Sequence, residues 1–351
     1  MAEIVLGIGT SHSPMLSTPP EQWHLMGEGD KSSGFLIDPE SGEPLSYEEL
    51  SSRRRDRTID VNEATFHRQW AACQTALGAL SHTLREIQPD VLVIVSDDQE
   101  EMLFDDSMPA LQIYWGDSIR LIPRFVPPSA PPVVRSWTWG YGDIEMDLPV
   151  AAQLGRHLIE ELTEQEFEVA SSRYLREGAL YGGRVGPAGD ILKPRVTPSR
   201  RQGLGHGWTF IIRRLLDNKP IPIVPVMLNT CYAPNAPTPR RCYRLGQALR
   251  AAVESYAPKQ RICVMASGGL SHFVTDESTD RLAIKGMVEK KPDLLFDLPR
   301  GRLQSAASET KNWIACAGAC EALTAELVDY VPVYRTPAGT GGGWAFMRWQ
   351  A

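Results

Sequence analysis

Residues 89–99 read PDVLVIVSDDQ, and this stretch decides the fold class. Val91–Val95 is an uninterrupted apolar, mostly β-branched run, which is typical of a strand buried on both faces. Pro89 ends the helix before it, because proline lacks the N–H that a helix interior needs. Strands covered on both faces belong to α/β folds, so the run predicts a sheet flanked by helices.

The clearest predicted helix lies just before this strand, at residues 62–88. Its apolar side chains recur at steps of three and four residues, so they form one stripe that faces a core. Residues 3–8 (EIVLGI) form another buried strand upstream, and strand, helix, strand predicts a parallel pairing by a right-handed crossover. The stripe comprises Phe66, Trp70, Cys73, Leu77, Leu80, Leu84 and Ile87.

Further strands are predicted at residues 221–228 and 262–266, near Tyr334, and at 344–349. Helices are predicted at 203–216, at 241–256, and from a cap at Ser308 through Ala317. The stretch 174–202 is rich in Gly, Pro and Arg and is expected to be irregular. No internal repeat or clear linker divides the 351 residues, which predicts a single catalytic domain over 1–351. The polar, turn-rich stretch 27–60 is either a surface loop or a lid inserted over a site.

Composition excludes several classes of protein. With 42% hydrophobic and 23% charged residues, the chain can bury a large core and is not expected to be disordered. A net charge of −7 argues against a nucleic-acid partner. No apolar run is long enough to span a membrane, and the N-terminus has no signal-peptide pattern. We therefore expect a cytoplasmic protein whose six cysteines are reduced.

Polar motifs follow three of the buried strands. GTSH ends in His12, SDDQEE contains Asp97 and Gln99, and SGGLSH ends in His272. The carboxyl ends of parallel strands share one edge of a sheet, where ligands bind, so these loops are expected to converge. Each motif alone also has a purely structural interpretation, such as a loop histidine or a turn aspartate. Glu309 likewise suits the first turn of its helix.

Taken together, four segments resemble a known family. GIGTSHSPML (7–16), PVMLNTCYAPNAPTPRRCYRLGQALRAAVESY (225–256), ASGGLSHF (266–273) and SETKNWIACAGA (308–319) occur in this order. The chain resembles the class III extradiol ring-cleavage dioxygenases, in the family of the protocatechuate 4,5-dioxygenase catalytic (beta) subunit. The opening GTSHSPMLSTPPEQW is most like the 3-O-methylgallate dioxygenase branch. The resemblance covers nearly the whole chain, with 27–60 as an insertion.

The resemblance implies both a fold and a reaction. The fold would be one α/β domain with a central mixed, largely parallel sheet flanked by helices. The reaction would be iron(II)-dependent extradiol cleavage of a catechol-type aromatic acid with incorporation of dioxygen. Gallate, 3-O-methylgallate or a protocatechuate-like acid would be the substrate, as in aromatic catabolism and lignin degradation. The family also leads us to expect a homodimer.

The resemblance also implies roles for individual residues. His12 and Glu309 match metal ligands, His272 matches the acid–base histidine, and His206 in GHGW matches a second active-site histidine. Where the family has its second ligand histidine, this chain has Gln99. Gln99 can bind the metal directly or through water. Alternatively Asp97 or Asp98 supplies an oxygen ligand, His67 or another histidine swings in, or the site has lost this chemistry.

Two other functions stay open at this point. One is a non-catalytic or metal-poor binding protein on the same fold, and the other is a zinc-type metal hydrolase. A substrate carboxylate would need a cation, and the insertion at 27–60 is a candidate for covering the site, as a small alpha subunit does in the protocatechuate enzyme. The candidate cations are Lys311, Arg240, Arg241 and Arg335.

Overall fold

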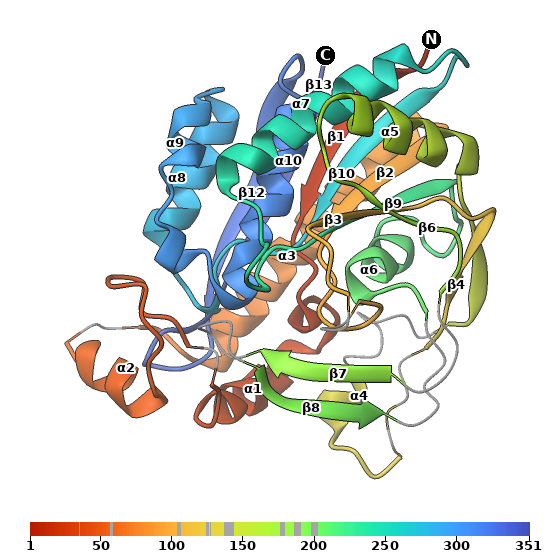
Figure 1. The fold of residues 1–351 in the computed structure, drawn as a ribbon. Helices are drawn as coiled ribbons and strands as arrows, with labels where there is room; N and C mark the ends of the chain where they lie inside the picture. Colours follow the sequence, from red (N-terminus) through yellow and green to blue (C-terminus); the bar gives the residue numbers. More distant parts are fainter. Residues whose placement is uncertain are drawn as a thin grey trace.

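The computed structural model describes residues 1–351 except 35, 57–58, 104–106, 124–125, 127, 137–143, 176–179, 186–190 and 198–202. Its centre is a nine-stranded sheet in the order β11-β13-β1-β10-β2-β9-β3-β6, with β12 paired to β13 (Figure 1). The four middle strands are parallel, and antiparallel pairs flank them on both sides. This confirms the predicted α/β fold with a mixed sheet.

The predicted strands are all present, with small changes in their bounds. β1 and β2 are parallel as predicted, but β10 lies between them and pairs with both. The prediction that β1 and β2 pair directly was therefore wrong. Residues 262–266 form an equally apolar strand, which is buried between them at the sheet centre. The strands are β1 (Glu3–Thr10), β2 (Val91–Ser96), β3 (Leu111–Tyr114), β6 (Ala170–Ser172), β9 (Ile223–Leu228), β10 (Arg261–Ser267), β11 (His272–Val274), β12 (Thr324–Tyr334) and β13 (Thr340–Gln350).

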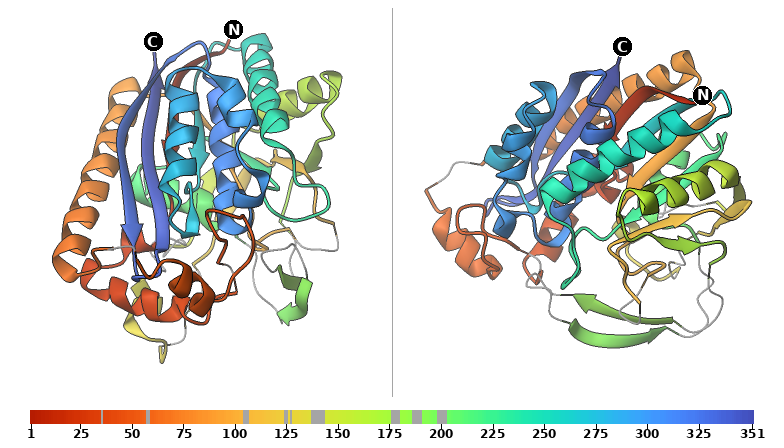
Figure 2. Two further views of the ribbon diagram at one scale, coloured as in Figure 1. Left: turned by 90° about the vertical axis from the view of Figure 1, so that its left-hand side faces the viewer. Right: turned by 45° about the horizontal axis from the view of Figure 1, so that its top comes forward.

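Both faces of the sheet are covered, which explains the run VLVIV. Val91, Val93 and Val95 pack into one core, and Leu92 and Ile94 pack into the other. The first core lies under helices α5 (Ala152–Glu164), α7 (Pro239–Ser255) and α10 (Thr310–Ala319), and the second under α3 (Glu63–Ile87) and α6 (His206–Arg214) (Figures 1 and 2).

Helix α3 confirms the strongest helix prediction, and two other expectations were wrong. Asn62 caps α3 by accepting a hydrogen bond from the Thr65 amide at 2.9 Å. Ser308 does not cap α10. It lies in the short 3-10 helix η5 (Ser305–Glu309), and its hydroxyl donates a hydrogen bond to the Thr230 hydroxyl at 2.8 Å. Residues 174–202 were expected to be irregular, but they contain the hairpin strands β7 (Leu180–Val185) and β8 (Ile191–Thr197).

The described residues of the segment 27–60, which was predicted to be an insertion, pack against the strand that carries His272. The segment's Leu36 and Leu50 form a small core with Val274 and Ala338. It contains the end of α1 (Trp23–Asp30) and all of α2 (Tyr47–Arg53), and Figure 1 shows α2 at the end of the sheet opposite the two chain termini. The remaining elements are η1 (Pro14–Ser17), η2 (Pro20–Gln22), β4 (Ser118–Leu121), α4 (Pro132–Ser136), β5 (Met146–Pro149), α8 (Glu277–Val288), α9 (Pro292–Phe296) and η4 (Arg300–Arg302).

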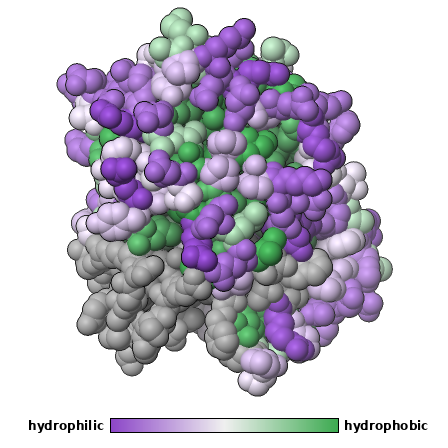
Figure 3. Space-filling model, turned by 90° about the vertical axis from the view of Figure 1, so that its right-hand side faces the viewer, coloured by the Kyte–Doolittle hydropathy of each residue, from purple (hydrophilic) through white to green (hydrophobic). Residues whose placement is uncertain are grey.

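Hydrophilic residues predominate over the described part of the face in Figure 3, with hydrophobic residues in smaller groups between them. Among the described residues, no helix combines the length and the apolar character that crossing a membrane requires.

Candidate active site

The carboxyl ends of β1, β2 and β10 meet at one edge of the sheet, as the sequence predicts. His12 follows β1 by two residues, and Asp97 comes directly after β2. Glu309 reaches the same point from the turn before α10. One ligand atom from each of these three side chains lies within 4.8 Å of the other two. The residues are 2%, 2% and 1% exposed, so the cluster is almost fully withdrawn from solvent.

The hydrogen bonds of His12 define its tautomer. The Ser267 hydroxyl donates its only proton to the Gly207 carbonyl at 2.5 Å, so it must accept from His12 Nδ1 at 3.0 Å. Nε2 therefore carries a lone pair, and it lies 3.4 Å from Glu309 Oε2. No hydrogen bond from a described residue reaches this buried Nε2. Two electron-rich atoms face each other here, which is the arrangement that a cation would satisfy.

The pKa values of the two carboxylates of the cluster are shifted in opposite directions. Burial acts to raise the pKa of Glu309, but the Gly269 amide and the positive charge that His12 and His272 carry when protonated lower it. Gly269 donates to Glu309 Oε2 at 2.5 Å. The pKa of Asp97 is raised to about 6 by burial and by the charge of Glu309. Without a cation, the second negative charge in this buried cluster is therefore unfavourable.

Of the three alternative ligands, only Asp97 joins the cluster. Asp98 turns away and accepts hydrogen bonds from the backbone amides of residues 101–103 at 2.9–3.2 Å. His67 has 54% of its side chain exposed on α3 and faces Glu63 at 3.7 Å. Gln99 does reach the site, but through its amide nitrogen, which lies 2.8 Å from Glu309 Oε1 and 3.3 Å from Asp97 Oδ2.

His272 lies on the other side of Glu309. Its Nδ1 must carry a proton, because its partner at 3.1 Å is the Leu270 carbonyl, which can only accept. Nε2 is left with a lone pair and lies 3.9 Å from Glu309 Oε2. Burial lowers the pKa of His272 despite the opposing effect of Glu309, so the neutral ring is favoured. This geometry suits a proton acceptor.

His206 begins α6 and lies beside His12, with ring centroids 4.6 Å apart. Its backbone amide and its Nδ1 both bond to Glu101 Oε2, at 2.7 and 2.8 Å. Burial acts to lower the pKa of His206, but the carboxylate of Glu101 outweighs it and raises the pKa. Gly207 permits this close approach, since a Cβ there would lie 2.1 Å from Ser96 Oγ.

Three of the four candidate cations for a substrate carboxylate are engaged by acidic or aromatic side chains. Arg335 forms a bidentate pair with Asp30 at 2.8 and 2.9 Å. Arg240 and Arg241 stack on aromatic rings, with their guanidinium carbons 4.2 and 4.1 Å from the ring centroids. Lys311 is buried in the first turn of α10 and donates to the Thr230 carbonyl. Burial lowers the pKa of Lys311, and no ion pair with a carboxylate is found for it in the described part of the chain.

Several supporting residues were missed by sequence reasoning. Asn312 donates to Asp97 Oδ1 at 3.0 Å, and it lies three residues after Glu309, on the same side of the helix start. That spacing was a readable signal. Glu101, which holds His206, is part of the acidic run SDDQEE but lies 105 residues from its partner. No local sequence pattern predicts such a contact.

The donor set fits a divalent transition metal. One imidazole nitrogen and two carboxylate oxygens converge from three different segments, and the ring of His12 is held in the ligating tautomer by Ser267. The set contains one nitrogen fewer than a site with two histidines and one carboxylate. Beside it, His272 and His206 provide two imidazoles that can exchange protons.

Comparison with known proteins places this site in context. Residues 60–314 match the family described as the catalytic LigB subunit of aromatic ring-opening dioxygenase. A segment of 81 residues is 42% identical to gallate dioxygenase of Pseudomonas putida KT2440, covering 22% of this chain and 24% of that protein. The chain thus matches only about a quarter of that relative's length. The uncharacterized protein JW3007 of Escherichia coli K12 aligns over 98% of this chain and 99% of its own, with a TM-score of 0.45 and 10% identity.

Proposed function

Because the chain belongs to the family of catalytic LigB subunits of aromatic ring-opening dioxygenases, we propose that it is an iron(II)-dependent extradiol dioxygenase. It would open the ring of a catechol-type aromatic acid beside the two hydroxyl groups and incorporate dioxygen. The observation that carries the proposal is the buried lone pair of His12 Nε2, which faces the carboxylate of Glu309 without a hydrogen bond from the described residues.

The protein's own groups have distinct tasks in this proposal. His12, Asp97 and Glu309 would hold the iron, which when bound brings a catechol and dioxygen together and favours the deprotonated phenol. His272 Nε2 accepts a proton from a substrate hydroxyl, since its Nδ1 proton is already engaged with Leu270. His206, bonded to Glu101, provides a second imidazole next to His12.

Gallate, 3-O-methylgallate and protocatechuate-like acids are the proposed substrates. The partial similarity to a gallate dioxygenase supports a hydroxylated benzoate. A carboxylate on the ring needs a cation, and we assign Lys311 to it, because the three arginine candidates are engaged with Asp30 or with aromatic rings. We also propose that the protein is cytoplasmic and forms a homodimer.

The direct test is oxygen uptake by iron-loaded protein. The protein is loaded with iron(II) without oxygen, mixed with each acid in turn, and exposed to air while oxygen and the ultraviolet spectrum are recorded. We expect oxygen uptake to match substrate loss one to one for one of the acids. Bound iron without uptake would contradict the proposed reaction, and full activity under argon on a non-catechol substrate would favour a metal hydrolase. Failure to retain iron would favour a binding protein.

The ligand set gives a first prediction. Asp97→Asn is expected to weaken iron binding by more than the roughly 10- to 100-fold cost of losing an outer-shell partner. Gln99→Ala is expected to stay within that range, because the Gln99 amide nitrogen bonds to the carboxylates instead of presenting an oxygen to the cluster. Iron affinity measured by competition with a chelator separates the two variants. Equal losses in both variants, or a larger loss in Gln99→Ala, would show that glutamine is the ligand.

The insertion at 27–60 gives a second prediction. We propose that it covers one side of the site, because its Ile37 and Pro39 line a small pocket together with His272. Replacing both by glycine removes this apolar wall and is expected to raise KM about tenfold, the effect of roughly 1.4 kcal/mol of lost binding. Leu25→Gly, at an exposed site on α1, is the control. An unchanged KM in the double variant would contradict a covering role.

A further inference from the structure

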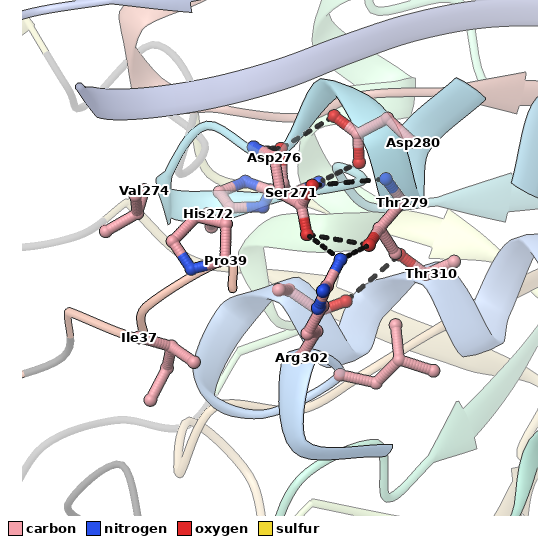
Figure 4. Close-up of a pocket in the computed structure, with 12 residues that line it drawn as sticks. Ile37, Pro39, Ser271, His272, Val274, Asp276, Thr279, Asp280, Arg302 and Thr310 are labelled. Carbon is pink, nitrogen blue, oxygen red and sulfur yellow. Dashed lines mark hydrogen bonds and ion pairs between the residues drawn. The ribbon is translucent and has the colours of Figure 1, made fainter. Parts of the chain in front are cut away.

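The buried carboxylate of Asp280 fixes the loop that carries His272. Asp280 has no role in the chemistry described above. Asp280 lies in α8 and is 2% exposed. Its Oδ1 accepts a hydrogen bond from the Ser271 amide at 2.8 Å, and its Oδ2 accepts one from the Ser271 hydroxyl at 2.6 Å. Ser271 directly precedes His272, and Figure 4 shows both bonds next to the histidine ring.

Asp280 is satisfied by neutral donors only. Tyr330 Oη donates to Oδ2 at 2.7 Å as the third partner, and no ion pair with Asp280 is found among the described residues. Burial of an uncompensated carboxylate is costly, and it raises the pKa of Asp280 to about 7. β13 also leaves room for this group, because a Cβ at Gly343 would lie 1.8 Å from Asp280 Oδ2.

The connection to His272 runs through the backbone of one residue. The ring is held by the bond from its Nδ1 to the carbonyl of Leu270, two residues earlier in the chain. Such a contact forms only when the residue between the two adopts the right backbone dihedral angles. That residue is Ser271, and its N–H and hydroxyl are the groups that Asp280 binds.

The orientation of the ring matters for the proposed chemistry. Nδ1 carries the proton, so Nε2 presents its lone pair toward the metal cluster, 3.9 Å from Glu309 Oε2. If the contact with Leu270 were lost, the proton could move to Nε2, and the ring would no longer be an acceptor on that side. The fixed loop therefore sets both the position and the tautomer of His272.

We propose that Asp280 is a positioning residue for His272: by fixing Ser271, it holds the imidazole in the Nδ1–H tautomer with Nε2 directed at the metal cluster. This inference deepens the proposed function and rests on it for the role of His272. It assigns to Asp280 a contribution to turnover without contact with the substrate.

The test uses an activity-independent signal together with kinetics. The full-length protein is labelled with ¹⁵N-histidine, and the His272 resonances are assigned by their loss in His272→Gln. In the wild type we expect the Nδ1–H tautomer. In Asp280→Ala we expect this tautomer to give way to a mixture, and kcat per folded, metal-loaded molecule to fall by up to about 100-fold, the cost of misplacing a catalytic group by about 1 Å. KM is expected to change less than about twofold.

Matched variants separate positioning from general stability. Tyr330→Phe removes a donor to Asp280 but leaves Ser271 bound, so we expect the tautomer and kcat of the wild type. Ser271→Ala removes one of the two bonds to the loop and takes over the test if Asp280→Ala does not fold. An unchanged His272 tautomer in both Asp280→Ala and Ser271→Ala would overturn the proposal, as would an equal change in Tyr330→Phe. An inactive wild type with the expected tautomer changes would overturn the proposed function and leave the positioning role intact.

Discussion

Glu309→Gln is expected to abolish iron binding and ring-opening activity together. The substitution keeps the shape of the side chain but replaces a charged oxygen by an NH₂ group at one of two positions. Glu309 Oε2 accepts from the Gly269 amide at 2.5 Å, and Oε1 accepts from Gln99 at 2.8 Å, so either orientation of the new amide places its NH₂ group against a donor. A neutral amide is also a weaker ligand than a carboxylate for a divalent ion.

The size of this effect follows from the position of Glu309 in the cluster. Changes to outer-shell partners typically cost about 10- to 100-fold in metal affinity, so losing a central carboxylate is expected to exceed about 100-fold. Iron content after anaerobic loading and gel filtration, and oxygen uptake in the presence of the substrate, are the two measurements. Wild-type iron content in Glu309→Gln would mean that the metal is held elsewhere.

A suitable control is Glu321→Gln. Glu321 is a half-buried glutamate held by Arg250 at 2.6 Å and by Gln247 at 2.9 Å, at the end of α10 away from the cluster. It tests the loss of a half-buried charge without touching the cluster of His12, Asp97 and Glu309. We expect it to lower the free energy of unfolding while leaving iron content unchanged.

The architecture was predictable because its signal is local. A strand buried on both faces must be apolar at every position, and Val91–Val95 meets that demand without reference to any other segment. The convergence of His12, Asp97 and His272 was predictable for a related reason, since parallel strands place their carboxyl ends at one edge. The order of the strands was not, because several apolar runs can occupy the centre of the sheet equally well.

Which of two neighbouring aspartates joins the cluster could be learned only from the structure. Asp97 and Asp98 are adjacent in the sequence and identical in chemistry, yet only one points into the cluster. The other accepts hydrogen bonds from the amides of the loop that follows it. Within a strand, neighbouring side chains point to opposite faces, and this rule would show which aspartate points inward. The strand ends at Ser96, so the rule does not apply to Asp97 and Asp98. The residues that fix the histidines could not be predicted from the sequence either, since Ser267 lies 255 residues from His12.

His272→Gln is expected to produce the second largest loss, in kcat alone. Positioned acid–base groups contribute roughly 10²- to 10⁴-fold to turnover, and glutamine cannot accept and return a proton at neutral pH. His272 Nε2 lies 3.9 Å from Glu309 and is outside the cluster of metal-ligating atoms. Iron content is therefore expected to stay at the wild-type level, which distinguishes this variant from Glu309→Gln.

Steady-state oxygen uptake with the best substrate, divided by the iron content of each preparation, measures this effect. His82→Gln is the matched control, because His82 is 64% exposed on α3 and pairs only with Glu86 among the described residues. It should leave kcat and iron content unchanged. A kcat within about threefold of the wild type in His272→Gln, well short of the loss expected for a proton-transfer group, would remove this histidine from the reaction and leave His206, next to His12, as the imidazole that exchanges protons with the substrate.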